Sequence, residues 1–204
     1  MPKYVTFNNK KFLPLKIVCI GRNYVEHIKE LNNEIPKEAV YFIKPNSSIG
    51  EEIIYQDNLH YEGEISFLIE NKKIKAVGFG FDMTLRKKQS FLKEKGLPWE
   101  RAKAFKNSAI FSEFVEIDDI NGLEIEVYKN NSLVQKGDIN LMIYKPLELI
   151  KEIDLVFGLD DFDIVMSGTP KGVGEVKLGD LFEGRILQNN KALISKKWEV
   201  KKRK

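Results

Sequence analysis

The stretch ISFLIENKKIKAVGFGF, residues 65–81, has the clearest pattern in the chain. Two apolar runs, Ile65–Glu70 and Ile74–Phe81, flank the polar triplet Asn71-Lys72-Lys73. Short runs rich in Ile, Val and Phe, joined by a polar turn, are typical of a β-hairpin. The stretch therefore predicts two adjacent antiparallel strands.

Similar patterns occur on both sides of this hairpin. Short apolar runs predict strands at 15–21, 40–43, 164–167, 180–187 and 192–197. Alternation around the Asn130-Asn131 pair predicts a second hairpin over 123–136. Helices are expected at 24–31, 84–95 and 145–153. Strands outnumber helices without regular βαβ alternation, which predicts a mainly β fold with short helices, of the α+β class.

Composition narrows the possible classes of protein. With 204 residues, 43% hydrophobic, the chain is long enough to bury a core as one domain, 1–204. It has no apolar run of membrane-spanning length and begins with a polar segment, so we expect a cytoplasmic protein with no membrane partner. Cys19 is the only cysteine, which excludes an intrachain disulfide. The net charge of +3 is too small to indicate nucleic-acid binding, and we expect a solvated basic tail over 198–204.

Two glutamates stand two residues apart where the hairpin begins. On a strand Glu62 and Glu64 share a face, where their charges repel unless a cation lies between them. Asp82 follows the second strand. Three carboxylates without a neighbouring histidine or cysteine ligand suit Mg²⁺ or Mn²⁺, one ion per chain. Taken locally, the glutamates also fit solvated acids of an edge strand, and Asp82 fits the N-cap of the next helix.

His27 and Glu30 lie three residues apart in a predicted helix. They would share one helical face, where the carboxylate can orient the imidazole, as a general base and its partner require. A surface ion pair is the alternative interpretation. The glycine-rich segment 168–174 contains a lysine but lacks Gly-Lys-Ser/Thr, so we exclude a nucleotide-binding loop.

Six ordered motifs between Lys16 and Arg185 resemble the fumarylacetoacetate hydrolase family, and most closely its short acylpyruvase and oxaloacetate decarboxylase branch. The motifs are Gly21-Arg22-Asn23-Tyr24-x-x-His27, Phe42-Ile43-Lys44-Pro45, His60-Tyr61-Glu62-Gly63-Glu64, Asp82-Met83-Thr84, Gly96-Leu97-Pro98-Trp99-x-x-Ala102-Lys103 and Ser167-Gly168-Thr169-Pro170-Lys171-Gly172-Val173-Gly174. The resemblance implies a mixed β-sandwich roll or pseudo-barrel, preceded by a lead-in over about 1–15, with a lid segment at 22–38. It also implies a homodimer.

The resemblance further implies roles for individual residues. The metal ligands would be Glu62, Glu64 and Asp82, and the catalytic residues His27, Glu30 and Lys103. The substrate-binding residues would be Arg22, Lys44, Arg86, Gln89 and Thr169.

The expected function is metal-dependent hydrolysis of a C–C bond in a small 2,4-dioxo acid, an acylpyruvate, to pyruvate and a carboxylic acid. Water would be activated by His27 and Glu30. The alternatives are decarboxylation or keto–enol tautomerisation of oxaloacetate, isomerisation or decarboxylation of an aromatic catabolite, and a non-catalytic metal- or ligand-binding homologue. The chain departs from the family at Lys87, where an acid is common, and in the short span from Ser48 to His60, which leaves substrate size open.

Overall fold

The hairpin predicted from residues 65–81 lies in the middle of the largest sheet of the computed structural model, which describes residues 1–31, 34 and 36–203. Its strands are β8 and β9, paired antiparallel with Gly63 opposite Phe81. In spatial order the sheet contains β2 (Lys10–Phe12), β1 (Val5–Phe7), β11 (Ala109–Glu116), β9 (Lys73–Asp82), β8 (Gly63–Glu70), β14 (Ile164–Met166), β3 (Lys16–Gly21) and β4 (Val40–Pro45), with β5 (Ile49–Gly50) paired to β11.

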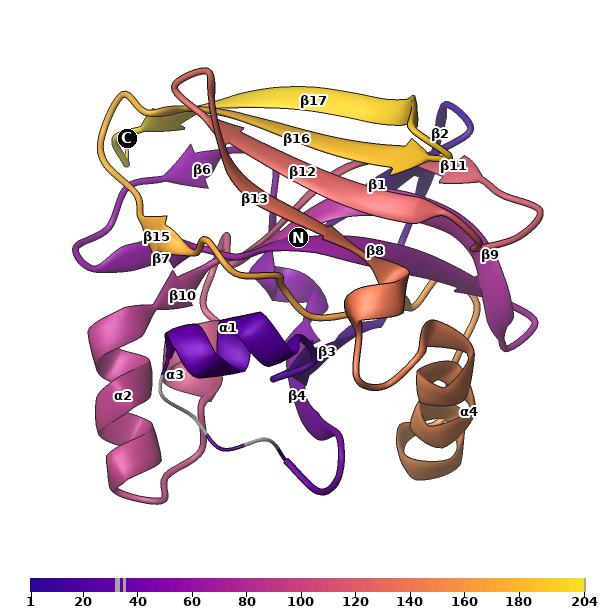
Figure 1. Ribbon diagram of the computed structural model, residues 1–204, viewed down its shortest axis with the longest axis horizontal. Helices are drawn as coiled ribbons and strands as arrows, with labels where there is room; N and C mark the ends of the chain where they lie inside the picture. The colour runs from indigo at the N-terminus through magenta and orange to yellow at the C-terminus, as the bar shows by residue number, and fades with distance from the viewer. Residues whose placement is uncertain (32–33, 35, 204) are drawn as a thin grey trace.

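Two smaller sheets complete the β structure. One contains, in spatial order, β13 (Ser132–Asp138), β12 (Leu123–Lys129), β16 (Leu181–Gln188), β17 (Lys191–Lys201) and β6 (Ile53–Ile54). The other contains β10 (Thr84–Leu85), β7 (Leu59–Tyr61) and β15 (Gly174–Glu175). The helices are α1 (Val25–Glu30), α2 (Arg86–Glu94), α3 (Glu100–Lys103) and α4 (Pro146–Phe157), with 3₁₀ turns η1 (Asn46–Ser48) and η2 (Ile139–Leu141). Figure 1 shows β12, β13, β16 and β17 as one layer and the helices on the opposite side of the molecule.

Aromatic side chains pack the two larger sheets together. Phe81 of β9 meets Phe182 of β16 and Trp198 of β17, and Phe79 meets Trp198, with ring centroids 5.3–5.6 Å apart. Because side chains alternate along a strand, the glycines beside Phe79 and Phe81 face the other way. There a Cβ on Gly80 would lie 2.3 Å from the hydroxyl of Ser66. The GFGF pattern thus places large rings on one face and allows close packing on the other.

Most expected elements are confirmed, but β7, α3 and the long strand β11 lie outside the sequence-based expectations. Further differences lie near the ends of the chain. The lead-in 1–15 contains β1 and β2, which pair with each other, and β1 also pairs with β11. The segment 198–204 is not a free tail up to Lys201, because β17 continues through it and buries Trp198 and Val200. The charged residues Lys197, Glu199 and Lys201 alternate with these two apolar residues, so only one face of the strand is solvated. No helix within the described ranges combines the length and apolar content needed to cross a membrane.

Candidate active site

The three carboxylates predicted to bind a metal lie together in the interior. Glu62 joins β7 to β8, Glu64 is the second residue of β8, and Asp82 ends β9. The backbone N–H of Asp82 donates to the carbonyl of Glu62 over 2.8 Å, so strand pairing places the two side by side. One carboxylate oxygen from each residue lies within 4.8 Å of the others, and all three residues are buried. Because Glu62 and Glu64 are buried, they are not solvated acids of an edge strand. Asp82 is not the N-cap of α2, because that helix begins later, at Arg86.

Three cations surround these carboxylates. Lys103 Nζ donates to Glu62 Oε2 over 2.8 Å, to Asp82 Oδ2 over 2.6 Å and to Thr84 Oγ1 over 2.7 Å. Arg86 donates to Glu62. Lys44 Nζ lies 2.9 Å from Asp82 Oδ1. Buried carboxylates require such compensation, since an unpaired charge in the interior costs several kcal/mol.

The pKa shifts of Glu62 and Glu64 go in opposite directions, so the cations compensate the three carboxylates unevenly. Burial acts to raise the pKa of Glu62, but the charges of Lys103 and Arg86 lower it overall. Burial and the nearby charges of Asp82 and Glu62 raise the pKa of Glu64 well above its ordinary range. The one recorded hydrogen bond to the Glu64 carboxylate comes, within the described part of the chain, from the backbone N–H of Gly168 over 2.8 Å. Glu64 is therefore the carboxylate that most needs an added positive charge.

The cluster fits a divalent cation. Asp82 Oδ1 is buried and receives no hydrogen bond from the described residues, although Lys44 lies near it as an ion-pair partner. All donors are carboxylate oxygens, which hard ions such as Mg²⁺ and Mn²⁺ prefer. An ion bound by Glu62, Glu64 and Asp82 would use that oxygen and keep Glu64 ionised.

His27 and Glu30 form the predicted pair on α1. His27 Nδ1 lies 3.0 Å from Glu30 Oε2, and the imidazole is buried. The other oxygen of Glu30 accepts the backbone N–H of Gly172 over 3.0 Å. This bond attaches α1 to the glycine-rich turn 168–174. Of the lid segment predicted at 22–38, residues 32, 33 and 35 lie outside the described residues.

One cavity brings most of the predicted residues together. Its lining includes His27, Glu62, Glu64, Asp82, Lys103, Arg22, Arg86, Gln89 and Thr169. The space open to the centres of water-sized molecules is small, about 40 Å³. Since one water needs roughly 10–15 Å³ by this measure, the closed cavity holds only a few waters. Only a compact substrate suits it without movement of the surrounding segments.

Two predicted substrate ligands have other contacts. Lys44 is fully buried and does not line the cavity, contrary to expectation. Its ammonium donates to the carbonyls of Lys103 and Ser108, so it lies behind Asp82. Thr169 lines the cavity, but its hydroxyl donates to the carbonyl of Gly63 over 2.8 Å. Both residues therefore support the metal ligands in this structure.

Two further residues at the site were not identified from sequence. Gln135 of β13 is buried and accepts the N–H of Gly63, between the two metal-binding glutamates, over 2.9 Å. Its Nε2 donates to Thr169 Oγ1 and to the carbonyl of Pro170, each over 2.8 Å. Lys93 of α2 lines the cavity. A lone glutamine or lysine in an amphipathic element carries no local signal of such a position.

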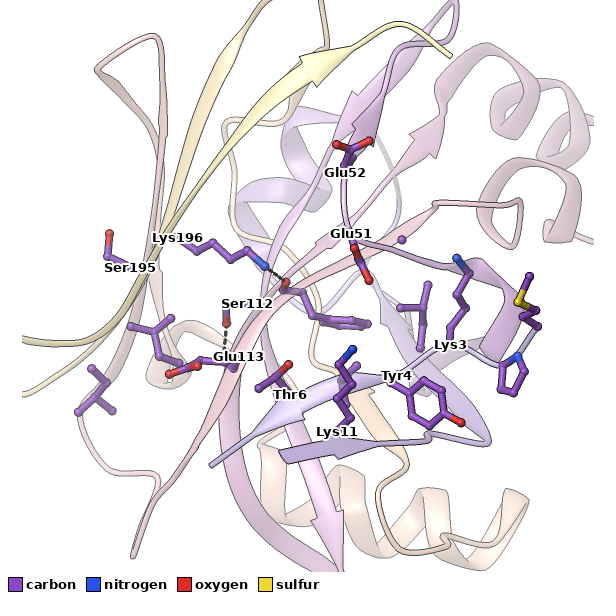
Figure 2. A pocket seen from close by; sticks show the side chains of 18 residues that line it. Lys3, Tyr4, Thr6, Lys11, Glu51, Glu52, Ser112, Glu113, Ser195 and Lys196 are labelled. Atoms are coloured by element: carbon purple, nitrogen blue, oxygen red, sulfur yellow. Dashed lines mark hydrogen bonds between the residues drawn. The ribbon is translucent and has the colours of Figure 1, made fainter. Parts of the chain in front are cut away.

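A larger groove lies elsewhere on the molecule. It has a volume of about 930 Å³ and shares no lining residue with the carboxylate cavity. Figure 2 shows its walls, which carry both lysines, such as Lys3 and Lys196, and acids, such as Glu51 and Glu113. Within the described residues the only cluster of metal-binding character is Glu62, Glu64 and Asp82. The smaller cavity is therefore the candidate active site.

Comparisons with known proteins agree with this geometry. The family described as "Fumarylacetoacetate (FAA) hydrolase C-terminal" matches residues 16–196. The mitochondrial oxaloacetate tautomerase of Schizosaccharomyces pombe is 35% identical, with 93% of this chain and 96% of that protein covered. The mitochondrial oxaloacetate decarboxylase of Dictyostelium discoideum is 34% identical, with 82% of this chain and 87% of that protein covered.

A solved structure agrees as well. The fumarylpyruvate hydrolase of Pseudomonas aeruginosa, in complex with Mn²⁺ and pyruvate, superposes with a TM-score of 0.89. It is 26% identical, and the comparison covers 99% of this chain and 97% of that one. The likeness extends over the sheets and over the segments that bring the carboxylates, His27 and Lys103 together. The chain therefore belongs to the fumarylacetoacetate hydrolase family and, like these relatives, is an enzyme.

Proposed function

We propose that the chain catalyses keto–enol tautomerisation of oxaloacetate, with decarboxylation of the same substrate as a related activity. The observation that carries this proposal is the meeting of a histidine base and a carboxylate metal site in one small cavity. The names of the relatives, oxaloacetate tautomerase and oxaloacetate decarboxylase, support oxaloacetate over an acylpyruvate.

His27 supplies the proton chemistry in this proposal. Tautomerisation removes a proton from C3 of oxaloacetate and places one on the oxygen at C2. The contact of 3.0 Å between His27 Nδ1 and the Glu30 carboxylate assigns the ring proton to Nδ1. Nε2 then carries the lone pair that can accept the C3 proton and pass it to the oxygen at C2.

The cavity also compensates the negative charge that develops on the 2-oxo oxygen. A divalent ion held by Glu62, Glu64 and Asp82 would polarise that oxygen as a Lewis acid, and Mg²⁺ and Mn²⁺ both suit the donors. The ammonium of Lys103 adds fixed positive charge beside the same carboxylates.

His27 also separates the two oxaloacetate activities. Decarboxylation breaks the C3–C4 bond, releases CO₂ and leaves the electron pair on the enolate of pyruvate, so no base needs to remove a proton from C3. Tautomerisation cannot proceed without proton transfer at C3. Replacing His27 should therefore affect the two reactions unequally.

Acylpyruvate hydrolysis is the second candidate. The same His27 and Glu30 could activate water for attack on the distal carbonyl, and the Pseudomonas aeruginosa fumarylpyruvate hydrolase shares the fold. The relatives named for oxaloacetate activities are 34–35% identical to this chain, against 26% for this hydrolase, which favours oxaloacetate.

The test compares His27→Ala with the wild type on oxaloacetate and acetylpyruvate, with Mg²⁺ or Mn²⁺ and with a chelator. Tautomerisation should fall roughly 10²- to 10⁴-fold, the usual contribution of a general base, while much of any decarboxylation persists. Glu26→Ala, on the exposed side of the same helix, is the matched control and should keep activity.

Equal loss of both oxaloacetate activities would argue against His27 as the base. Faster metal-dependent release of pyruvate from acetylpyruvate than turnover of oxaloacetate would favour the hydrolase instead. If neither compound is turned over in a metal-dependent way, the proposal is wrong.

Three other expectations stay predictions. They are the homodimer, the cytoplasmic location and an activity on an aromatic catabolite. Light scattering during gel filtration tests the first, with a dimer expected at twice the chain mass of 23.6 kDa.

A further inference from the structure

Lys93, in the last turn of α2, places a positive charge at the cavity. It lines the cavity together with Arg22, Arg86 and Lys103. These four cations exceed the three carboxylates of the same lining, and a bound divalent ion would enlarge the excess. A ligand with one negative charge would leave most of this excess uncompensated.

The four cations are not equivalent. Arg86 and Lys103 form ion pairs with Glu62 or Asp82, so the metal-binding carboxylates already use them. Within the described ranges, Arg22 makes no recorded ion pair, and its Nε is buried without a hydrogen-bond partner. Its backbone is in the left-handed region at φ 59°, uncommon outside glycine and often found at functional sites.

Lys93 and Arg22 act on each other. Burial and then the charges of Arg22 and Arg86 lower the pKa of Lys93. The Lys93 ammonium also lies 5.8 Å from the centre of the Trp99 ring, at the edge of cation–π range. Two cations held near one another at a partly buried wall create a position that favours an anionic group.

This position would face the part of a substrate that does not bind the metal. A 2-oxo acid would present its carboxylate and 2-oxo oxygens to the metal, so its remaining atoms extend toward the rest of the lining. In oxaloacetate those atoms end in a second carboxylate. In an acylpyruvate with an alkyl group they are uncharged.

We propose that Lys93, together with Arg22, binds the distal carboxylate of a four-carbon dicarboxylic 2-oxo acid and so selects dianionic substrates. The inference rests on the proposed function, because it names the residue that distinguishes oxaloacetate from a neutral-tailed acylpyruvate. Lys93 is a specificity residue and takes no part in proton transfer.

The test compares oxaloacetate with its 4-methyl ester, which differs by the loss of the distal charge. For the wild type, kcat/KM should be at least about tenfold higher for oxaloacetate, as expected of a charge-assisted hydrogen bond. Lys93→Met keeps the aliphatic stem and should raise KM for oxaloacetate by about the same factor, with KM for the ester changed less than about twofold. Lys93→Arg should retain most of the preference.

Lys87→Met is the matched control, because Lys87 is an exposed lysine of the same helix and does not line the cavity. It should leave the preference for the dianion unchanged. A wild-type enzyme without that preference, or equal effects of Lys93→Met on both substrates, would overturn the inference. If Lys93→Met does not fold, Lys93→Gln and the wild-type preference give the same decision.

A binding measurement separates this inference from the proposed function. Calorimetry with 3,3-difluoro-oxaloacetate, which has no C3 proton to lose, and with its 4-methyl ester reports selection without tautomerisation. If oxaloacetate is not turned over but Lys93→Met loses tighter binding of the diacid, the function fails and the specificity residue stands. If oxaloacetate is turned over but the variant binds both ligands as the wild type does, only the inference fails.

Discussion

The three metal-binding carboxylates share a cluster but differ in environment. Lys103 and Arg86 stabilise the charge of Glu62, and Lys103 and Lys44 lie against Asp82. Glu64 has no such ion pair among the described residues and receives a backbone N–H instead. Glu64 is thus the carboxylate under repulsion from its neighbours, and a divalent ion would relieve that repulsion.

Glu64→Gln should therefore change stability and metal binding in opposite directions. Glutamine can still accept the N–H of Gly168 but removes the repulsion from Asp82 and Glu62, so thermal denaturation in chelator should show a more stable protein. Mn²⁺ affinity, followed by electron paramagnetic resonance, should fall at least about tenfold, since even outer-shell changes cost that much.

Glu113→Gln, at an exposed position of β11, is the control for removing one negative charge and should change neither property. A metal-free Glu64→Gln protein less stable than the wild type would show that the glutamate is well compensated without an ion.

At the scale of elements, α1 is positioned by a turn far away in the sequence. Gly172 has φ +99°, and a Cβ there would lie 1.9 Å from the carbonyl oxygen of Val134. Its N–H holds Glu30, which in turn orients His27. The catalytic pair on α1 thus depends on the absence of a side chain in the turn.

Gly172→Ala should displace the turn and with it Glu30. We expect a loss of stability of about 1–3 kcal/mol or more, together with a lower kcat for oxaloacetate, measured by denaturation and by steady-state kinetics. Gly179→Ala is the matched control, because Gly179 also has positive φ, +82°, but has nothing within 4 Å of the added Cβ.

Gly179→Ala should therefore lose some stability through backbone strain while keeping kcat. A Gly172→Ala enzyme with wild-type kcat would mean that Glu30 does not need this turn to orient His27.

At the scale of the whole molecule, polar contacts hold the five-stranded sheet together in addition to the aromatic core. Asp180 accepts hydrogen bonds from Asn130 Nδ2 over 2.9 Å and from the backbone N–H of Lys177 over 2.7 Å. Its other partner is Lys129, at 2.9 Å. Asp180 therefore connects the hairpin of β12 and β13 to the segment just before β16.

These contacts predict acid sensitivity. Burial acts to raise the pKa of Asp180, but its hydrogen bonds and Lys129 lower it overall, below the ordinary value of 3.8. The stabilisation is fully present above that value and is lost as the pH falls through the lower pKa of the folded protein. The difference in unfolding free energy between wild type and Asp180→Asn should be constant at neutral pH and shrink below about pH 4.

Urea denaturation across pH measures this difference, with Asp118→Asn as the control at an exposed aspartate for which the structure records no side-chain hydrogen bond among the described residues. A difference for Asp180→Asn that grows on acidification would contradict the assigned sign.

Sequence alone determined the mainly β class, both hairpins, the carboxylate donors and the pairing of His27 with Glu30, because these depend on short-range periodicity, turn residues and ordered motifs. Only the tertiary structure decided which residues from distant segments contact one another. Thr169 binds the carbonyl of Gly63, 106 residues away in sequence, and Gln135 binds its N–H over a separation of 72. Lys44 and Lys103, both solvated cations by local pattern, become buried partners of Asp82 only when the fold brings their side chains from β4 and α3 to the end of β9. A local pattern identifies the chemical groups, whereas burial and long-range pairing determine their partners.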